Sequence, residues 1–437
     1  MKPSETFFLK ALSPKNFLFI SREAVILDLA WCIKNEGHKV KFYIDVKSER
    51  EVGAGFVQRV KHWEKHIDWA DIIIFDHVGY GEIAENLRKQ GKLVVGGSQY
   101  TDQLENDRSF GQDELEAHGI KILDYEEFSD FDTAIAFVKT NPGKYVIKPS
   151  GEAQHQKQFV FIGAEEDGSD VIRILKSYQK TWGDEISTFQ LQKKMTGVEV
   201  SVAAFFNGKK FIAPINITFE HKKLFPGELG VSTGEMGTSM FWNKSSPIFE
   251  KTLRKMEPRL AKTGYVGSID LNTIVNNNGI YPLEFTCRFG HPQISIQREG
   301  ILDEMGALFY QLAQGKDFTF KTRKGFQVGV LLVVPPFPYK DNKTLNSFSK
   351  DAVVVFEKKN YEGIHPQDLR SYKGEWLITG SSGIALLVTG TGTTMREAQK
   401  QAYGRIQHIL IPNMYYRTDI GNRWYDEGDK LHSWGYI

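Results

Sequence analysis

The chain has few of the features that identify membrane, secreted or nucleic-acid-binding proteins. No apolar run approaches the roughly 20 residues that span a bilayer, and the first residues lack a signal peptide's apolar stretch and cleavage site. Only two of the 437 residues are cysteines, Cys32 and Cys287, far apart and without metal-ligand spacing. With 55 basic and 54 acidic residues, the charge balance gives no electrostatic footprint for nucleic acid. We therefore expect a cytoplasmic protein that binds neither membrane nor nucleic acid.

The first 105 residues alternate between strand-like and helix-like segments. Helical spacing over 23–34 separates the first two of four short apolar runs, which lie at 16–20, 40–44, 71–75 and 93–96. This alternation is typical of βαβ units on a parallel sheet. The GxGxxG turn of a dinucleotide site is absent after the first run, where the chain reads Ser21-Arg22-Glu23. The pattern therefore predicts a Rossmann-like domain without a dinucleotide site.

Two apolar runs joined by an asparagine- and glycine-rich turn predict a β-hairpin near residue 280. The runs GSIDLN (267–272) and YPLEFT (281–286) flank NNNG (276–279). If the loop holds three residues with a bulge at the glycine, Asp270 lies opposite Glu284. Two carboxylates so close repel each other unless they share a proton or a cation, and Mg²⁺ or Mn²⁺ prefers oxygen ligands. We predict a metal site at these two residues, and an ordinary hairpin with solvated acids is the alternative.

Three further charged residues are candidates for phosphate or nucleotide binding. Lys148 ends the apolar run 145–148 before a polar loop, where it could reach over phosphates or simply be solvated. Glu199 precedes a strong strand and could accept hydrogen bonds from ribose hydroxyls, although a solvated glutamate is the simpler interpretation. Arg288 follows the predicted metal ligand Glu284 and can form two parallel hydrogen bonds to a carboxylate or phosphate.

Taken in chain order, these motifs resemble the ATP-grasp ligases, and within them the phosphoribosylamine-glycine ligase family. Lys148, then GVEVS (197–201), then the Asp270 and Glu284 hairpin follow the ATP-grasp order. The segment EFTCRFGHP (284–292) resembles that family's EFNCRFGDP, and YRTDIG (416–421) resembles its YRRDIG. The stretches at 103–105, 221–223 and 233–237 resemble its QLE, DHKR and TGGMG. The likeness covers nearly the whole chain.

The resemblance implies a fold of class α/β plus α+β. It implies a Rossmann-like (pre-ATP-grasp) domain at 1–105, an ATP-grasp domain at 106–325 and a small C-terminal domain at 326–437. It also implies an ATP-dependent ligase that activates a carboxylate as an acyl phosphate and joins it to an amine. In the family, glycine and phosphoribosylamine give glycinamide ribonucleotide, ADP and phosphate. The implied partners are small-molecule substrates, and the implied assembly is a monomer or homodimer.

The roles that the resemblance implies fall on eleven residues. ATP would be held by Lys148, Gln192, Glu199 and Lys157, and Mg²⁺ or Mn²⁺ by Asp270 and Glu284. Arg288 and Lys148 would act in catalysis, Arg288 on the acyl phosphate or substrate carboxylate. The residues implied in substrate binding are Arg22, His221, Lys223, Arg288 and Arg417.

The chain departs from the family at several substrate-facing positions. FISREA (19–24) replaces the glycine-rich turn GxGGREHA, and the ATP-covering loop has lost its later glycines. Thr286, His291 and Gln293 stand where the family has asparagine, aspartate and glutamate. Two other interpretations therefore stay open, an ATP-grasp ligase that joins a different carboxylate and amine, and a non-catalytic nucleotide-binding protein. The retained charged residues argue against the second of these.

Overall fold

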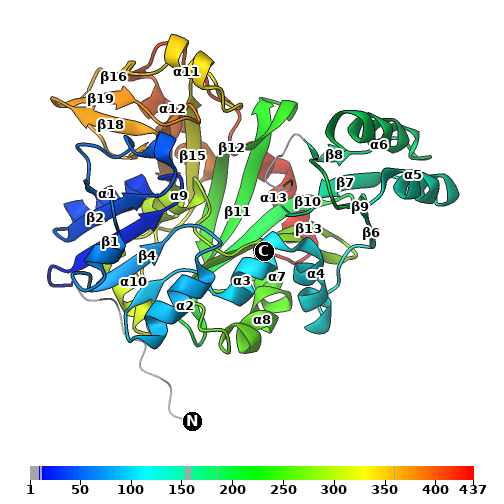
Figure 1. Ribbon diagram of the computed structural model, residues 1–437, viewed down its shortest axis with the longest axis horizontal. Helices are drawn as coiled ribbons and strands as arrows, with labels where there is room; N and C mark the ends of the chain where they lie inside the picture. The colour runs from blue at the N-terminus through cyan, green and yellow to red at the C-terminus, as the bar shows by residue number, and fades with distance from the viewer. Residues whose placement is uncertain (1–8, 10–11, 152, 154–158, 184, 359) are drawn as a thin grey trace.

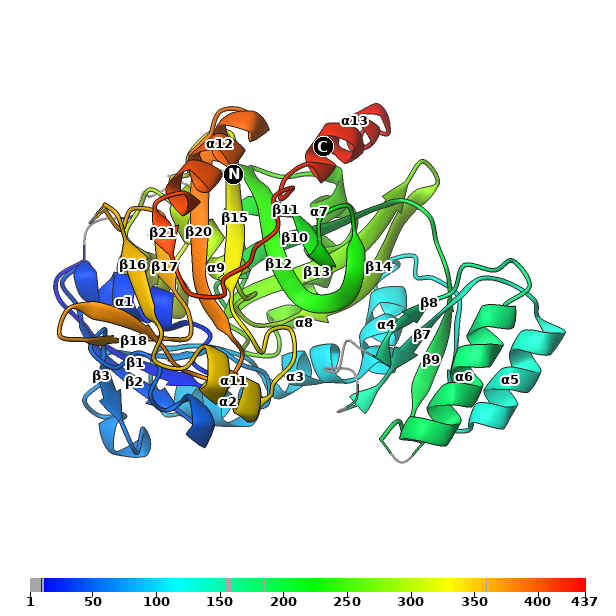
Figure 2. The same ribbon diagram turned by 90° about the horizontal axis from the view of Figure 1, so that it is seen from above.

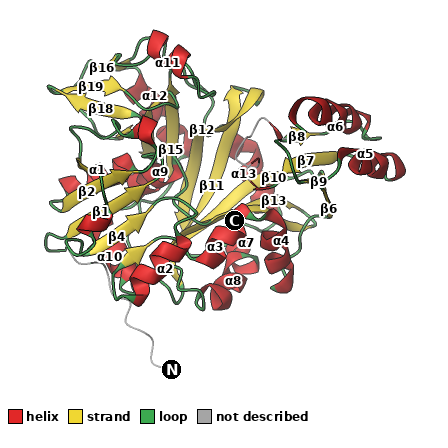
Figure 3. Cartoon of the chain, viewed as in Figure 1, coloured by secondary structure: helices red, strands yellow, loops and turns green. Residues whose placement is uncertain are grey.

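Four β-sheets form the framework of the protein in its computed structural model (Figures 1 and 3). The structure describes residues 9, 12–151, 153, 159–183, 185–358 and 360–437. Within them, a five-stranded N-terminal sheet and a four-stranded sheet lie on either side of an eight-stranded central sheet, and a further four-stranded sheet is C-terminal (Figure 2). This arrangement confirms the predicted mixture of α/β and α+β architecture.

The N-terminal sheet is parallel and has the strand order β3-β2-β1-β4-β5. Its strands are β1 (Asn16–Ser21), β2 (Lys39–Ile44), β3 (Gln58–Val60), β4 (Ile72–Phe75) and β5 (Val94–Val95). Its helices are α1 (Leu27–Asn35), α2 (Gly81–Lys89) and the short η1 (Lys47–Glu49) and η2 (Glu64–His66). The strand order reverses between β1 and β4, and open α/β sheets bind ligands beyond the carboxyl ends of the strands at such a point. Glu23 and His77, which follow these two strands, lie at that edge.

A smaller sheet of order β6-β9-β7-β8 carries two helices on one face only (Figure 2). The strands are β6 (Tyr125–Phe128), β7 (Tyr145–Pro149), β8 (Phe161–Ile162) and β9 (Phe189–Lys193), and the helices are α5 (Phe131–Thr140) and α6 (Ser169–Trp182). Tyr145, Ile147 and Leu191 pack in one apolar cluster with these helices. Because side chains alternate along a strand, Lys148 and Gln192 lie on the opposite face.

The central sheet has one apolar face and one polar face. Its strand order is β14-β13-β10-β11-β12-β15-β20-β17. The first five of these in chain order are β10 (Val198–Phe206), β11 (Phe211–Phe225), β12 (Leu229–Asn243), β13 (Gly267–Asn276) and β14 (Gly279–Thr286). Val200, Ile217 and Leu271 share an apolar cluster with residues of α7 (Pro247–Lys251) and α8 (Leu253–Leu260). The alternating positions point the other way, and many of them are polar.

The hairpin of β13 and β14 is confirmed, but its register is not the one expected. Asn276 pairs with Gly279, so the loop holds two residues, and the register shifts again beyond Asn272. Asp270 lies opposite Thr286, and Asn272 lies opposite Glu284. The prediction that Asp270 and Glu284 face each other directly was therefore wrong. Because paired residues share a face of the sheet, the two carboxylates still point to the same side, on a diagonal.

The segment after residue 325 extends the central sheet before it forms a sheet of its own. Strands β15 (Phe326–Val333), β20 (Ile384–Gly392) and β17 (Ile364–Pro366) continue the central sheet beyond β12. The C-terminal sheet has the order β18-β19-β16-β21, with β16 (Val353–Phe356), β18 (Leu369–Tyr372), β19 (Glu375–Ile378) and β21 (Ile409–Leu410). The three-domain division stays a prediction, since segments on both sides of residue 325 contribute strands to one sheet.

The remaining helices are short. They are α3 (Gln99–Asn106), α4 (Arg108–Ala117), α9 (Gln293–Gly300), α10 (Met305–Ala313), α11 (Asn342–Phe348), α12 (Met395–Ile406) and α13 (Arg423–Ser433). Among the described residues no helix has the length and apolar character needed to cross a bilayer.

A buried ion-pair cluster joins three distant parts of the chain. The Asp28 carboxylate on α1 lies 3.2 Å from Arg298 Nη2 on α9 and 2.9 Å from His365 Nδ1 on β17. Asp28 and His365 are almost fully buried. Burial alone would raise the pKa of Asp28, but Arg298 and His365 bring it below its ordinary value. The ionised Asp28 carboxylate therefore stabilises the fold above the unfolded-state pKa of about 4. This stabilisation is lost as the pH falls through the pKa of Asp28 in the folded state.

Asp28→Ala should lower the denaturant midpoint of unfolding, because Arg298 and His365 stay buried without their carboxylate. Removing one partner of a buried pair costs about 3–5 kcal/mol. Asp68→Ala is the matched control, since it removes the exposed carboxylate that pairs with Lys92 and should leave the midpoint unchanged. Equal midpoints for the two variants in urea unfolding at pH 7 would contradict this role of Asp28.

Candidate active site

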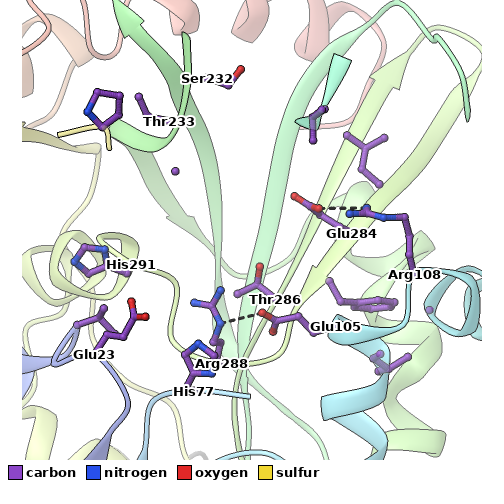
Figure 4. Close-up of a pocket in the computed structure, with 18 of the residues that line it drawn as sticks. Glu23, His77, Glu105, Arg108, Ser232, Thr233, Glu284, Thr286, Arg288 and His291 are labelled. Atoms are coloured by element: carbon purple, nitrogen blue, oxygen red, sulfur yellow. Dashed lines mark hydrogen bonds and ion pairs between the residues drawn. The ribbon is translucent and has the colours of Figure 1, made fainter. Parts of the chain in front are cut away.

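A cavity of about 990 Å³ lies where the N-terminal sheet, α3 and α4, the β12 and β14 edges and the segment after β15 meet (Figure 4). Charged and polar side chains line it, and three of the predicted site residues are among them: Lys223, Glu284 and Arg288. The cavity also reaches Glu23 and His77 at the carboxyl edge of the N-terminal sheet. Its position at the topological switch point matches the place where open α/β sheets bind small molecules.

Arg288 is held in the cavity by Glu105, which lies in the last turn of α3. Glu105 Oε1 accepts a hydrogen bond of 2.9 Å from Arg288 Nε, and Oε2 accepts one of 2.7 Å from the Cys287 amide. The carboxylate raises the pKa of Arg288 above its ordinary value, so the guanidinium stays charged. Figure 4 shows that Arg288 reaches into the cavity from its floor. The two-point contact therefore orients an arginine whose remaining N–H groups can bind a carboxylate or phosphate.

Glu284 is paired with a cation that sequence reasoning did not single out. Arg108 Nη1 on α4 lies 3.4 Å from Glu284 Oε2, and both residues line the cavity (Figure 4). The Arg108 side chain is nearly buried, and its Nε has no hydrogen-bond partner among the described residues. Buried polar groups are normally satisfied, so this nitrogen is suited to an acceptor on a ligand.

Lys148 lies close to this pair, on the polar face of the smaller sheet. Its Nζ donates a hydrogen bond of 2.6 Å to Gln192 Oε1 on β9. Burial lowers the pKa of Lys148 to about 7, and repulsion from Arg108 acts in the same direction, against the attraction of Glu284 and Glu199. A phosphate beside the amino group would restore its charge, because an anion favours the protonated form. Lys148 and Gln192 are thus in direct contact, and their role in nucleotide binding stays a prediction.

The polar face of the central sheet concentrates carboxylates around one lysine. Lys222 Nζ lies 2.6 Å from Glu199 Oε1 and 3.2 Å from Glu220 Oε2. Burial would raise the pKa of Glu199, but Lys222 brings it down to about 2. Asp270 behaves in the opposite way, because burial and the nearby Glu220 raise its pKa to about 7. Gln293 Nε2 donates a hydrogen bond of 3.0 Å to the Asp270 carboxylate.

These side chains fit a divalent cation and a nucleotide. Asp270 and Glu284 share a face and offer only oxygen ligands, and the raised pKa of Asp270 marks a carboxylate that a cation would stabilise. Within the described residues, no group of three or more His, Cys, Asp or Glu side chains could hold a metal by itself. Phosphate oxygens would have to complete the coordination. Gln190 Oε1 and Gln192 Nε2 on β9 are buried and have no partner among the described residues.

Two predicted substrate-binding residues lie in a separate buried cluster. Arg417 is fully buried and binds Asp419 and Glu228 at 2.7 and 2.8 Å. His221 is also buried, and its Nε2 accepts a hydrogen bond of 3.0 Å from the Gly421 amide. This leaves the proton on Nδ1, 3.2 Å from Glu228 Oε1. The cluster joins β11 to the chain after α12, and neither side chain lines the cavity.

The remaining predicted residues have mixed positions. The Arg22 side chain is exposed after β1, and its amide donates a hydrogen bond of 3.2 Å to the buried Asp76 carboxylate. Lys157 lies outside the described residues. Sequence reasoning missed Arg108, Asp76, Glu220 and His77. Glu105 had been noted only for its QLE context, and its pairing with a residue 183 positions away leaves no local signal.

Comparisons with known proteins agree with this architecture. Residues 106–294 match the family model of the phosphoribosylglycinamide synthetase ATP-grasp (A) domain, and residues 328–423 match that of its C domain. Phosphoribosylamine-glycine ligase from Neisseria meningitidis is 24% identical over 353 residues, which are 78% of this chain and 81% of that protein. The ligase of that name from Streptococcus pneumoniae is 24% identical over 358 residues, with the same coverage.

Solved structures show the same fold at low sequence identity. A crystal structure of phosphoribosylamine-glycine ligase from Thermotoga maritima superposes with a TM-score of 0.72 at 21% identity, covering 93% of this chain and 100% of that chain. The biotin carboxylase domain of Hydrogenobacter thermophilus 2-oxoglutarate carboxylase, solved with MgADP and bicarbonate, gives 0.63 at 12% identity, covering 98% and 100%. N5-carboxyaminoimidazole ribonucleotide synthetase from Thermotoga maritima gives 0.57 at 13% identity, covering 91% and 99%.

Lys148 should react with an amine-selective acylating reagent at neutral pH, unlike ordinary lysines. With a pKa of about 7, about half of its amino groups are neutral at that pH, whereas a lysine near pKa 10.4 is protonated. Peptide mass spectrometry between pH 6 and 9 measures the rate at each lysine, and Lys148→Arg confirms the assignment of the peptide. The rate at Lys148 should level off above pH 8. A rate that still rises steeply at pH 9 would refute the lowered pKa.

Proposed function

Because the chain is an ATP-grasp protein with the ATP-grasp and C domains of phosphoribosylglycinamide synthetase, we propose that it is an ATP-dependent carboxylate-amine ligase. Its proposed substrates are glycine and phosphoribosylamine, which its relatives' names indicate. The observation that carries the proposal is the cavity in which Glu105 orients Arg288 beside the Glu284 and Arg108 pair.

The nucleotide would lie between the polar faces of the smaller and central sheets. Lys148 and Gln192 offer donors from one side, and Glu199 offers a carboxylate from the other. Asp270 and Glu284 would hold Mg²⁺, or Mn²⁺, against phosphate oxygens. When bound, ATP with its metal supplies the phosphoryl group and neutralises charge on it. Catalysis of this kind depends on positioning and electrostatics, which is what the fixed cationic and anionic side chains provide.

Arg288 would position the carboxylate that is activated. Figure 4 places Glu284 and Arg108 on one side of Arg288, and Glu23 and His291 on the other. A carboxylate bound by Arg288 would therefore have the phosphoryl donor on the β14 side and the amine on the side of the N-terminal sheet. After phosphoryl transfer, the same guanidinium can stabilise the charge on the acyl phosphate.

The turn after β1 supports a phosphorylated amine despite its lack of glycine. Ala24 adopts a left-handed backbone conformation, with φ of 65°, which costs a non-glycine residue about 1–2 kcal/mol. The first turn of α1 follows, and in the described part of the chain its N-cap residue, Ile26, makes no side-chain cap hydrogen bond. Such amides are typical phosphate-binding groups. The turn therefore retains a glycine-like conformation without glycine.

A second candidate, a ligase for a different amine, is favoured by one observation at the same turn. The Arg22 amide is already bound to the buried Asp76 carboxylate, and Glu23 pairs with Lys340 at 3.1 Å. Two acidic side chains beside the turn would oppose a phosphate dianion. Another carboxylate or amine would then occupy the same cavity and use the same acyl phosphate chemistry.

Omission of each reactant in turn tests the proposed substrates. ADP release should require Mg²⁺-ATP, glycine and phosphoribosylamine together, with phosphoribosylamine generated in the cuvette. Release that persists without phosphoribosylamine, or that needs another amine, would favour the second candidate. Arg22→Ala tests the turn itself and should raise the KM for the amine if the phosphate lies there.

Glu284→Gln should abolish turnover, because it removes a proposed metal ligand and leaves Arg108 without its carboxylate. We expect kcat to fall by about 10²-fold or more, the scale of losing one preorganised electrostatic contact. Glu126→Gln, an exposed carboxylate on β6, is the matched control and should leave kcat unchanged. If Glu284→Gln keeps its fold by circular dichroism and still produces ADP at the wild-type rate, Glu284 is not a metal ligand.

A further inference from the structure

His291 lines the cavity and is held in one tautomer by a buried glutamine. Its Nε2 lies 2.6 Å from Gln367 Oε1, and the Gln367 amide nitrogen donates to the His365 carbonyl at 3.4 Å. The glutamine nitrogen is therefore used elsewhere, and its oxygen faces His291. An amide oxygen only accepts, so Nε2 of His291 carries the proton. The lone pair of the neutral ring is then on Nδ1, for which no hydrogen bond is found among the described residues.

The surroundings of His291 keep the imidazole neutral. Burial lowers its pKa, and the Arg288 guanidinium lowers it further, while the Gln367 hydrogen bond and the Glu23 carboxylate act in the opposite direction. From the segment after β15, Lys340 faces the same space and is paired with Glu23. From the end of β4, His77 completes the set of titratable neighbours. The net effect is a free acceptor nitrogen at neutral pH.

We propose that His291 is the general base of the amide-forming step in the ligase reaction proposed above. The amine nitrogen attacks the acyl carbon held at Arg288, and a C–N bond forms as the C–O bond to phosphate breaks. Phosphate leaves with the electron pair of that bond. The proton that the amine nitrogen loses passes to Nδ1 of His291 and later to solvent. Where this chain has His291, the family's segment EFNCRFGDP has aspartate, so the role belongs to this chain's own residue.

The geometry around Arg288 favours this assignment. Figure 4 draws His291 and Glu23 on the side of Arg288 away from Glu284 and Arg108. The base therefore lies where the amine would approach, opposite the side from which the phosphoryl group arrives. Burial would raise the pKa of Glu23, but Lys340 brings it below its ordinary value, and such a carboxylate is a weak base at neutral pH. A neutral imidazole is better matched to this proton transfer.

His77 is the rival base, because it lines the same cavity. Its Nδ1 lies 2.7 Å from the carbonyl of its neighbour Val78, so its Nε2 also has a lone pair. Figure 4 places it directly below Arg288. His77→Gln is therefore the matched comparison for His291→Gln.

The test separates the two half-reactions. Hydroxylamine traps acyl phosphates without a catalyst, so hydroxamate from glycine and ATP reports carboxylate activation alone. We expect His291→Gln to form hydroxamate at the wild-type rate, because carboxylate activation does not need the base. Its kcat for amide formation should fall about 10²-fold, and its KM for the amine should not change. The pH profile of its kcat should have no acidic limb. His77→Gln should keep that limb. Equal amide formation by His291→Gln and wild type, or loss of the limb only in His77→Gln, would overturn the proposal.

Two further measurements guard against ambiguous outcomes. Gln367→Glu places a carboxylate on Nε2 and should raise the pKa of His291, so the acidic limb should move to higher pH; an unmoved limb counts against the proposal. Long-range ¹⁵N NMR of the histidine rings should show the Nε2–H tautomer of His291 in the free protein, and an Nδ1–H tautomer would refute the base. Wild type that forms neither hydroxamate nor amide would instead refute the proposed ligase function.

Discussion

Backbone pairing of β10 with both β11 and β13 is the constraint on which the site depends. The pairing sets Ser201 against Thr218 on one side and against Asn272 on the other. Because side chains alternate along each strand, this register places Glu199, Glu220 and Asp270 on one face while the intervening apolar residues pack on α7 and α8. A shift of one residue would bury the carboxylates in the apolar core. The apolar pattern therefore selects the register, and the polar face follows from it.

Three of the acidic side chains around the cavity each form an ion pair with a basic side chain. Glu105 is used by Arg288, Glu284 by Arg108 and Glu23 by Lys340. Paired carboxylates orient their cations without leaving an unbalanced buried charge. Asp270 differs, because burial and Glu220 raise its pKa, and the side chains that donate to it are the Gln293 amide and the Ser201 hydroxyl. Of these four carboxylates, Asp270 is the one that a bound cation would stabilise most.

The cavity draws its lining from parts of the chain that are distant in sequence. Glu23 and His77 come from the N-terminal sheet, Arg288 and His291 follow β14, and Lys340 follows β15. The buried Asp28, Arg298 and His365 cluster joins the same three regions away from the cavity. Packing that fixes these regions relative to one another also fixes the distances across the cavity. Stability and site geometry thus depend on overlapping contacts.

Local patterns of apolar residues and turns were enough to predict the main elements of the fold. Alternating apolar runs predicted the parallel N-terminal sheet and the hairpin, and motif order predicted the ATP-grasp architecture. Tertiary structure alone decided the hairpin register, because a two-residue turn and an added bulge set Asp270 opposite Thr286. It also decided that His221 and Arg417 form a buried cluster and that Arg108 pairs with Glu284. Such partners are separated by more than 170 residues along the chain, and only the folded packing brings them within hydrogen-bond distance.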